Sequence, residues 1–254
     1  MKYLIFLDID GTVLADGKIH PRTVNGIREA QKLGHMVFIN TGRSMSFIPK
    51  IVLDEVRPDG IVAGLGAYIR VGDEVFLSET ASKELIKLSM DVAKMLDNTL
   101  ILEGENASVS FLKSMYLGKE NEVTGVEDIF ERFPDINIEK MTYVRPLTPE
   151  GTKMLEPYFE VFNHPTYSEI GLKGYSKAKG MELLRERFGI DKDHVIAMGD
   201  SDNDTLMLKA AGIAVVMGNG HPDVKKIADL ISIDCADGGV GYAIEKLILE
   251  KSDR

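Results

Sequence analysis

The chain opens with MKYLIFLDIDGTVL (residues 1–14), a stretch that places two carboxylates directly after an apolar run. The run YLIFL predicts a buried strand, and Asp8 and Asp10 follow it, with Gly11 and Thr12 behind them. Residues two apart on an extended chain point to the same side. Carboxylates held that close repel each other and raise each other's pKa unless a cation or a proton lies between them. The stretch therefore predicts a metal, a shared proton, or both.

Composition narrows the class of protein. The 254 residues are 44% apolar and 28% charged, which favours one large or two modest folded domains over a disordered chain. The formal net charge of -10 argues against a sequence-independent nucleic-acid binder and against a protein of anionic membrane surfaces, because both need a basic face. An anionic substrate fits only if one pocket supplies a local cation or metal.

Cysteine usage and the apolar runs indicate the compartment. Cys235 is the single cysteine, so no disulfide within the chain is available and nothing implies an oxidising environment. The first apolar run is about six residues long, shorter than the apolar region of a signal peptide. No run approaches the roughly 20 residues of a membrane span. We therefore expect a soluble cytoplasmic protein whose oligomeric state the sequence leaves unknown.

The first third of the chain alternates strands and helices, which is the pattern of a parallel α/β sheet. Gly72-Asp73 predicts the turn of a hairpin at the end of this part. The expected elements are a strand at 3–7, a helix within 20–35, a strand at 36–40, a helix at 44–54, a strand within 58–67 and the hairpin at 68–77.

The pattern changes near residue 80 and returns near residue 173. Between these points, short strands that pair locally are interleaved with helices, which is α+β character. After residue 173, helices and strands alternate again up to a final helix at 239–250. We therefore expect a doubly wound, mainly parallel α/β core domain made of residues 1–79 and 173–254, with an inserted α+β domain at residues 80–172.

Polar clusters lie near the carboxyl ends of the core strands, where open parallel sheets bind their ligands. Taken singly, each has an ordinary explanation, such as a helix cap, a turn or a solvated lysine. Together they bring acids, a hydroxyl, a lysine and free backbone amides to one rim, which describes a site for Mg²⁺ and a phosphoryl group. The clusters are Asp8–Thr12, Thr41–Arg43, the region of Lys177, and Gly199–Asp204.

These clusters resemble a known set of motifs. DIDGT, TGR, SKAKG and GDSDND are similar, in this order, to the four motifs of the haloacid dehalogenase superfamily. The long interval between the second and third resembles the Cof-type hydrolases, which carry an α+β cap of type IIB at that place. The resemblance covers essentially the whole chain. It implies a Mg²⁺-dependent phosphatase with a capped α/β core.

The resemblance also implies roles for the two opening acids. Asp8 matches the nucleophile that is phosphorylated in the first half-reaction, which splits one hard hydrolysis into two easier steps. Asp10 matches the general acid and base, which protonates the leaving oxygen and later deprotonates the attacking water. Phosphatases of this superfamily have an acid at the position of Asp10, whereas dehalogenases do not.

The remaining motif residues match the metal and phosphate ligands of the family. The implied Mg²⁺ ligands are Asp8, the backbone carbonyl of Asp10, and Asp200, with Asp204 in the metal shell or just behind it. The implied phosphate cradle consists of Thr41, the amides of Gly11 and Gly42, Lys177 and Asn203.

Two positions need comment. The third motif holds both Lys177 and Lys179, and the interval to the end of the following helix favours Lys177. Where many relatives have Asn-Gly-Ala after the third strand, this chain has Leu65-Gly66-Ala67. A substrate contact made by that asparagine is therefore not expected here.

Several functions compete. The leading hypothesis is a phosphatase for small phosphomonoesters, above all sugar phosphates, because a cap over the site leaves little room for macromolecules. A phosphomutase would return the phosphoryl group instead of giving it to water. A phospho-receiver module is far shorter and lacks an insert, and a phosphate-binding pseudoenzyme would not need every motif acid. Some polar or aromatic residues could contact a sugar ring, although each could equally be ordinary surface or core. They are Arg70, Tyr116, Tyr143, Arg145 and Tyr167.

Overall fold

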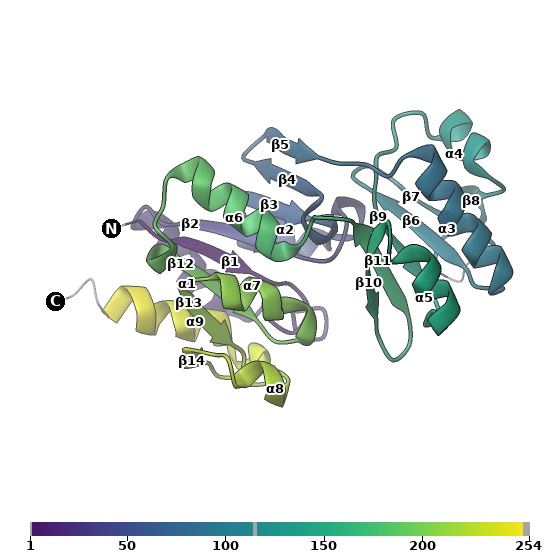
Figure 1. Ribbon diagram of the computed structural model, residues 1–254. Helices are drawn as coiled ribbons and strands as arrows, with labels where there is room; N and C mark the ends of the chain where they lie inside the picture. The colour runs from purple at the N-terminus through teal and green to yellow at the C-terminus, as the bar shows by residue number, and fades with distance from the viewer. Residues whose placement is uncertain (1, 114–115, 251–254) are drawn as a thin grey trace.

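Figure 1 shows the computed structural model, which describes residues 2–113 and 116–250. Within these residues the strands form a larger and a smaller sheet. The larger sheet takes its strands from both ends of the chain, and the smaller takes them from the middle. In spatial order, the strands of the larger sheet are β14 (Leu230–Ile231), β13 (Ile213–Val216), β12 (Val195–Gly199), β1 (Leu4–Leu7), β2 (Met36–Asn40), β3 (Gly60–Ala63), β4 (Tyr68–Val71) and β5 (Glu74–Ser78).

The larger sheet is mainly parallel. The strands from β14 to β3 run parallel, whereas β4 and β5 form an antiparallel hairpin at one edge. Every residue of β1 is buried, and strands covered on both faces become continuous apolar runs such as LIFL. The hairpin turns at Gly72-Asp73, which confirms that expectation.

Helices cover both faces of the larger sheet, which confirms the doubly wound, mainly parallel α/β core. One apolar cluster joins one face of the sheet to α1, α2 and α9, and a second joins the opposite face to α6, α7 and α8. These helices are α1 (Pro21–Lys32), α2 (Lys50–Val56), α6 (Lys177–Phe188), α7 (Thr205–Ala210), α8 (Pro222–Lys225) and α9 (Gly239–Ile244), which continues as a π-helical turn at Glu245–Leu249.

The single helix expected at 44–54 is wrong. The structure has a 3-10 turn at Met45–Phe47, an extended Ile48 with ψ 121°, and then α2 from Lys50 to Val56. Pro49 explains the break, because a proline ring disfavours the helical conformation of the residue before it. The proline then serves as the N-cap of α2.

The smaller sheet has one covered face. Its apolar side chains pack against three helices, which lie on the side away from the larger sheet in Figure 1. The opposite face looks toward the core. The elements are the strands β10 (Phe159–Asn163), β11 (Ser168–Leu172), β9 (Ile138–Tyr143), β6 (Leu100–Gly104), β7 (Ser108–Phe111) and β8 (Glu122–Val123), in spatial order, and the helices α3 (Lys83–Met95), α4 (Val126–Arg132) and α5 (Pro149–Leu155).

The two crossings between the sheets meet at Gly66 and Ala67. The carbonyl of Ala67 accepts a 2.9 Å hydrogen bond from the amide of Glu79, where the chain leaves the core hairpin. Gly66 has φ +91° and abuts the backbone of Ser176, where the chain returns; an added Cβ would lie 2.2 Å from the Ser176 carbonyl oxygen. Only glycine fits this position, because it combines a left-handed backbone with no room for a side chain.

Within residues 2–113 and 116–250, we find no helix long and apolar enough to cross a membrane.

Candidate active site

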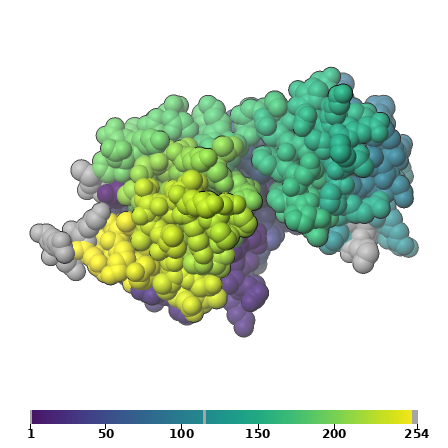
Figure 2. Space-filling view, turned by 60° about the horizontal axis from the view of Figure 1, so that its bottom comes forward, coloured from purple at the N-terminus to yellow at the C-terminus, as the bar shows by residue number. Residues whose placement is uncertain are grey.

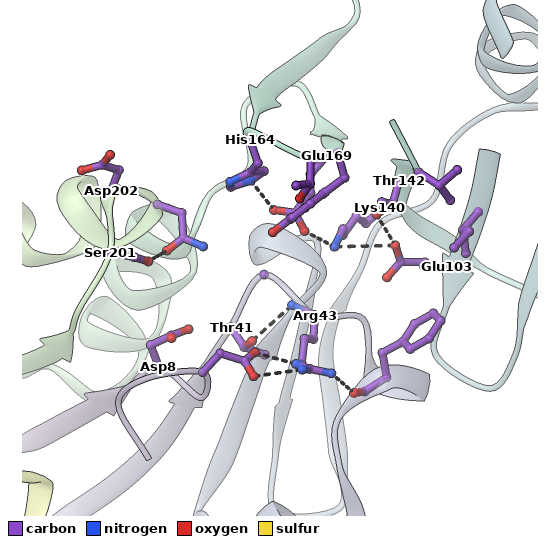
Figure 3. Close-up of a pocket in the computed structure, with 18 of the residues that line it drawn as sticks. Asp8, Thr41, Arg43, Glu103, Lys140, Thr142, His164, Glu169, Ser201 and Asp202 are labelled. Carbon is purple, nitrogen blue, oxygen red and sulfur yellow. Dashed lines mark hydrogen bonds and ion pairs between the residues drawn. The ribbon is translucent and has the colours of Figure 1, made fainter. Parts of the chain in front are cut away.

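A pocket of about 740 Å³ lies between the carboxyl ends of the core strands and the uncovered face of the smaller sheet. Figure 2 shows the furrow between the yellow-green lobe of the C-terminal residues and the teal lobe of the insert. Figure 3 shows the side chains that converge from both. From the core, the lining residues include Asp8, Asp10, Thr41–Arg43 and Asp200–Asn203.

A buried lysine lies directly behind the core wall of the pocket. Lys177 is the first residue of α6, whose N-cap Ser176 accepts a hydrogen bond from the amide of Lys179. The Lys177 ammonium lies 2.6 Å from Asp8 Oδ1 and 2.8 Å from Asp204 Oδ1. Both carboxylates outweigh the effect of burial and raise the pKa of Lys177. Neither Lys177 nor Lys179 lines the pocket, but Lys177 contacts the lining residue Asp8 from behind.

The turn after β1 fits closely against Asp200. Gly11 has φ +78°, and an added Cβ would lie 2.4 Å from Asp200 Oδ2. The Thr12 hydroxyl donates a 3.1 Å hydrogen bond to Asp200 Oδ1. The Gly11 amide, which the resemblance assigned to the phosphate, instead donates to the carbonyl of Leu14 at 3.0 Å, because it closes the tight turn there.

Three acids form a cluster that could bind a divalent metal. One carboxylate oxygen from each of Asp8, Asp200 and Asp204 lies within 4.8 Å of the others. Burial, only partly offset by Lys177, raises the pKa of Asp8 to about 7, and burial together with Asp204 raises the pKa of Asp200 to about 6. With Lys177 as the nearby cation, the ionised cluster carries two excess negative charges. An oxygen-ligated divalent cation suits that charge and that donor set.

Asp204 is held differently from the other two acids. Its Oδ1 accepts from Lys177, and its Oδ2 accepts from the amides of Asp200 and Ser201 at 3.0 and 3.1 Å. With both oxygens engaged, Asp204 is better placed to orient the Asp200 loop and Lys177 than to be a primary ligand. The capping box that it forms with Ser201 starts the helical segment that leads into α7.

Asp10 pairs with an arginine to which the sequence assigned no role. Arg43 donates from Nε to Asp10 Oδ2 at 2.7 Å and from Nη2 to Asp10 Oδ1 at 2.9 Å. A third donor, Nη1, bonds the carbonyl of Phe47 at 2.9 Å. The fork fixes Asp10 on the pocket side of the turn, with its side chain half exposed. The motif TGR carried this signal, but its arginine was not connected to Asp10.

The remaining residues expected to cradle phosphate lie around the same centre. Thr41 and Gly42 follow β2 and line the pocket, and Thr41 accepts a 3.2 Å hydrogen bond from the Arg43 amide. Asn203 also lines the pocket, and its Oδ1 lies 3.4 Å from the Lys177 ammonium. The structure therefore places these three residues beside Asp8 and Lys177.

The opposite wall carries charged residues from three strands of the smaller sheet, β6, β9 and β11. Lys140 is buried and forms an ion pair with Glu169, and its ammonium lies 3.6 Å from Glu103 Oε1. His164 Nε2 lies 3.1 Å from Glu169 Oε2 (Figure 3). The Thr142 hydroxyl donates to Glu103 at 2.5 Å. This wall was not predicted from the sequence, although the charged residues inside β6, β9 and β11 were a usable signal.

Only two of the five residues proposed to contact a sugar line the pocket. Tyr116 and Tyr167 line it. Tyr143 lies in the apolar core of the insert, where its hydroxyl donates to the carbonyl of Ser89 at 2.8 Å. Arg70 and Arg145 do not line the pocket, and the Arg145 guanidinium bonds the carbonyl of Asp97.

Leu65 confirms that the chain departs from the Asn-Gly-Ala pattern in structure as well as in sequence. It is buried, with φ +55°, a left-handed conformation that leucine rarely adopts. Its side chain reaches the backbone of both Gly42 and Gly171. An apolar wedge between the core rim and β11 thus replaces the polar contact that an asparagine would offer.

Comparison with known proteins identifies the family. A sequence model of the haloacid dehalogenase-like hydrolases matches residues 5–244. The chain belongs to this family. Together with the likeness to a subclass IIB structure described next, the match confirms the Cof-type resemblance.

Several relatives of this hydrolase are named as phosphatases. It is 30% identical to the 5-amino-6-(5-phospho-D-ribitylamino)uracil phosphatase YcsE of Bacillus subtilis, over 97% of this chain and 96% of that protein. It is 29% identical to a phosphoglycolate phosphatase of Methanopyrus kandleri, over 98% and 99%. Its fold resembles the subclass IIB sugar phosphatase BT4131, with a TM-score of 0.81, 26% identity, and coverage of 96% and 98%. The chain is therefore a phosphoric monoester hydrolase.

Proposed function

We propose that this hydrolase cleaves small phosphomonoesters, above all sugar phosphates, with Mg²⁺ and through a phospho-aspartate on Asp8. The observation that carries the proposal is the position of the Asp8 carboxylate. It lies at the end of β1 in the pocket, 2.6 Å from the Lys177 ammonium and within reach of Asp200. An anionic nucleophile needs such positive charge nearby to meet a phosphate dianion.

The reaction would proceed in two halves. Asp8 attacks phosphorus, the bond from phosphorus to the leaving oxygen breaks, and Asp10 gives its proton to that oxygen. Water then attacks the phosphoryl group and gives a proton back to Asp10. The bond from phosphorus to Asp8 breaks in this step, so phosphate is released and Asp8 is restored. Lys177, Thr41, Gly42 and Asn203 would hold the phosphoryl oxygens.

Arg43 has a positioning role in this scheme. Its fork holds both oxygens of Asp10, so Asp10 has to yield at least one of these hydrogen bonds when it carries a proton. A substrate phosphate would compete for the same guanidinium. Substrate entry would thus loosen Asp10 from Arg43 at the stage where Asp10 is needed as an acid.

The metal would be held by Asp8, the backbone carbonyl of Asp10, and Asp200, with Asp204 behind them. Mg²⁺ would neutralise charge on the phosphoryl oxygens and on Asp8. The fit rests on the excess negative charge of the cluster and on its all-oxygen donor set.

We further infer that residues 80–172 act as a cap that closes over Asp8. The insert has its own sheet and its own apolar cluster, and its uncovered face lines the pocket. Both chain crossings meet at Gly66 and Ala67, which gives a compact place for a hinge. A closed cap would exclude water and contact the leaving group. The names of the relatives cover several leaving groups, so they support a small phosphorylated metabolite in general. A cytoplasmic location stays a prediction.

The test is the release of inorganic phosphate from p-nitrophenyl phosphate and from glucose 6-phosphate in the presence of Mg²⁺. Asp8→Asn should abolish release from both, because the amide is a poor nucleophile. Asp16→Asn is the matched control: Asp16 is exposed, with φ +48°, a conformation that asparagine tolerates. Parental turnover by Asp8→Asn, with deamidation excluded, would reject the covalent mechanism. An isomeric sugar phosphate as product, in place of inorganic phosphate, would identify a mutase.

A further inference from the structure

The face of the cap sheet that meets the pocket carries a buried row of charges. Lys140 of β9 lies opposite Glu103 of β6, and Thr142 of β9 lies opposite Glu169 of β11. Because side chains alternate between the two faces of a strand, these four lie on one face. The neighbouring positions Leu102 and Met141 lie in the apolar core on the other face. The row is therefore part of the pocket wall rather than of the cap core.

Both permanent cations of the described pocket lining are already paired. Arg43 holds Asp10 through two hydrogen bonds. Lys140 pairs with Glu169 and lies 3.6 Å from Glu103. The lysine and the two glutamates are each less than 10% exposed, so solvent screens these charges little.

This wall offers acceptors rather than a spare positive charge. Glu103 accepts hydrogen bonds from Thr142 and from Ser44, and Glu169 accepts from Lys140. A carboxylate can accept about four hydrogen bonds, so each glutamate keeps capacity for a ligand hydroxyl. A ligand carboxylate or second phosphate would instead meet two carboxylates whose cation is already engaged.

The wall lies directly above the phosphate end of the pocket. A Cβ placed on Gly42 would lie 3.9 Å from Glu169 Oε1, so the carboxylate reaches the loop that follows β2. Tyr167 and His164 stack with ring centroids 4.3 Å apart beside it. The part of a leaving group nearest to a phosphoryl group at Asp8 would therefore contact Glu169.

We propose that Glu103, Lys140 and Glu169 select a neutral leaving group rich in hydroxyls and reject one that carries a second anionic group. The proposal rests on the proposed function, since it assumes that a phosphoryl group occupies the core end of the pocket. Hydroxyls donate to the glutamates, whereas an anion is repelled by them. Rejection by unfavourable contacts is as effective a source of specificity as new attraction.

The test compares two substrates that differ only at carbon 1: sorbitol 6-phosphate, with a hydroxymethyl group, and 6-phosphogluconate, with a carboxylate. The parent should prefer sorbitol 6-phosphate in kcat/KM by about 10²-fold, because like charges meet in a desolvated pocket. Glu169→Gln should reduce this ratio by about tenfold, mainly by improving 6-phosphogluconate, since Lys140 regains free charge. If turnover of the pair is too slow, the ratio is read from their inhibition of p-nitrophenyl phosphate hydrolysis.

Glu160→Gln on β10 is the matched control, because Glu160 belongs to the same sheet, pairs with Lys173 and does not line the pocket. Its ratio should equal that of the parent. If circular dichroism shows that Glu169→Gln does not fold, Glu103→Gln takes its place, since Glu103 flanks Lys140 on the other side.

Two results would overturn the inference: a parent that uses both substrates equally, or a ratio that stays unchanged in folded Glu169→Gln and Glu103→Gln. Failure of the parent to hydrolyse p-nitrophenyl phosphate or any sugar phosphate would instead contradict the proposed function. The two failures are therefore distinguishable.

Discussion

The two walls of the pocket bury the same arrangement, a lysine between two carboxylates. In the core, Lys177 bridges Asp8 and Asp204, and in the cap, Lys140 lies between Glu103 and Glu169. The carboxylates respond in opposite ways. The pKa of Asp8 rises to about 7, whereas the pKa of Glu169 falls to about 2.

The neighbours explain the difference. Burial raises the pKa of Asp8, and the further acids Asp204 and Asp200 add to that effect against Lys177. Burial acts in the same direction on Glu169, but Lys140 and His164 outweigh it. The core cluster therefore keeps excess negative charge that a metal would offset, while in the cap Lys140 and His164 favour the ionised form of Glu169. This difference supports the proposal that phosphoryl chemistry belongs to the core and the choice of leaving group to the cap.

Removal of divalent metal should have the largest effect, because the acid cluster of the core keeps excess negative charge even with Lys177 beside it. We expect no detectable turnover of p-nitrophenyl phosphate in excess EDTA, and recovery when Mg²⁺ is added back. Because the cap wall is proposed to choose the leaving group, the order of preference among sugar phosphates should be the same before metal removal and after recovery. Full turnover in EDTA by protein shown to be metal-free would contradict the assignment of Asp8 and Asp200 to a metal site.

Asp10→Asn should have the next largest effect on turnover. The loss of general acid and base chemistry is expected to lower kcat by about 10²–10⁴-fold. Phosphate binding should remain largely intact, because Asp10 is paired with Arg43 and not with Lys177. Steady-state kinetics with phosphate as a competitive inhibitor separates the two quantities. A variant that loses phosphate affinity but keeps kcat would show that Asp10 binds the phosphoryl group instead.

Lys177→Met should lower kcat/KM by about 10²–10³-fold for every substrate, because it removes a charge that faces the phosphoryl site. Lys179→Met is the control two residues along the same helix, because the ammonium that pairs with Asp8 and Asp204 belongs to Lys177. The thermal midpoint of Lys177→Met should also fall, because Asp8 and Asp204 lose their buried partner. Equal losses in the two variants would show that helix α6, and not the Lys177 ammonium, is what matters.

The smallest effect concerns Glu139, which lies beside the hinge and outside both walls. It is fully buried, and its carboxylate has no hydrogen-bond partner among the described residues. Burial, with Glu105 and Glu103 nearby, raises the pKa of Glu139 from 4.5 to about 8. The folded state therefore keeps a proton that the unfolded state has lost between pH 4.5 and 8. The free energy of unfolding therefore falls as the pH rises from 4.5 to about 8, because the unfolded state gives up this proton first.

Glu139→Gln should remove this dependence. Relative to the parent, the thermal midpoint of the variant should gain on the order of 5 °C between pH 6 and pH 9. Glu127→Gln, at an exposed position of the same insert, should show no such gain. A difference between parent and Glu139→Gln that is the same at both pH values would mean that Glu139 does not titrate in this range.

The two walls also differ in how far the sequence predicted them. The core residues Asp8, Asp10 and Asp200 stand in short contiguous motifs next to strand ends, and parallel strands bring such ends together. Lys177 stands in a similar motif at the start of a helix. Local sequence therefore determined their proximity. Pairings set by side-chain geometry were not visible, such as Asp10 with Arg43.

The cap wall depends on antiparallel register between strands far apart in the chain. Glu103, Lys140 and Glu169 come together only because β9 pairs with both β6 and β11. Tyr143 shows the same limit: it was a candidate sugar contact, but the alternation of β9 turns it into the core. The break at Pro49 is an error of another kind, because the rule that governs it is local and was available.

If the core performs the phosphoryl chemistry as proposed, Asp8 carries the phosphoryl group between the two half-reactions. The most direct measurement is acid quenching of the enzyme during turnover of p-nitrophenyl phosphate, followed by mass spectrometry of its peptides. We expect a phosphoryl group on Asp8 that forms before free phosphate accumulates and decays as substrate is exhausted. Unmodified Asp8 throughout turnover, or a phosphoryl group on another residue, would contradict it.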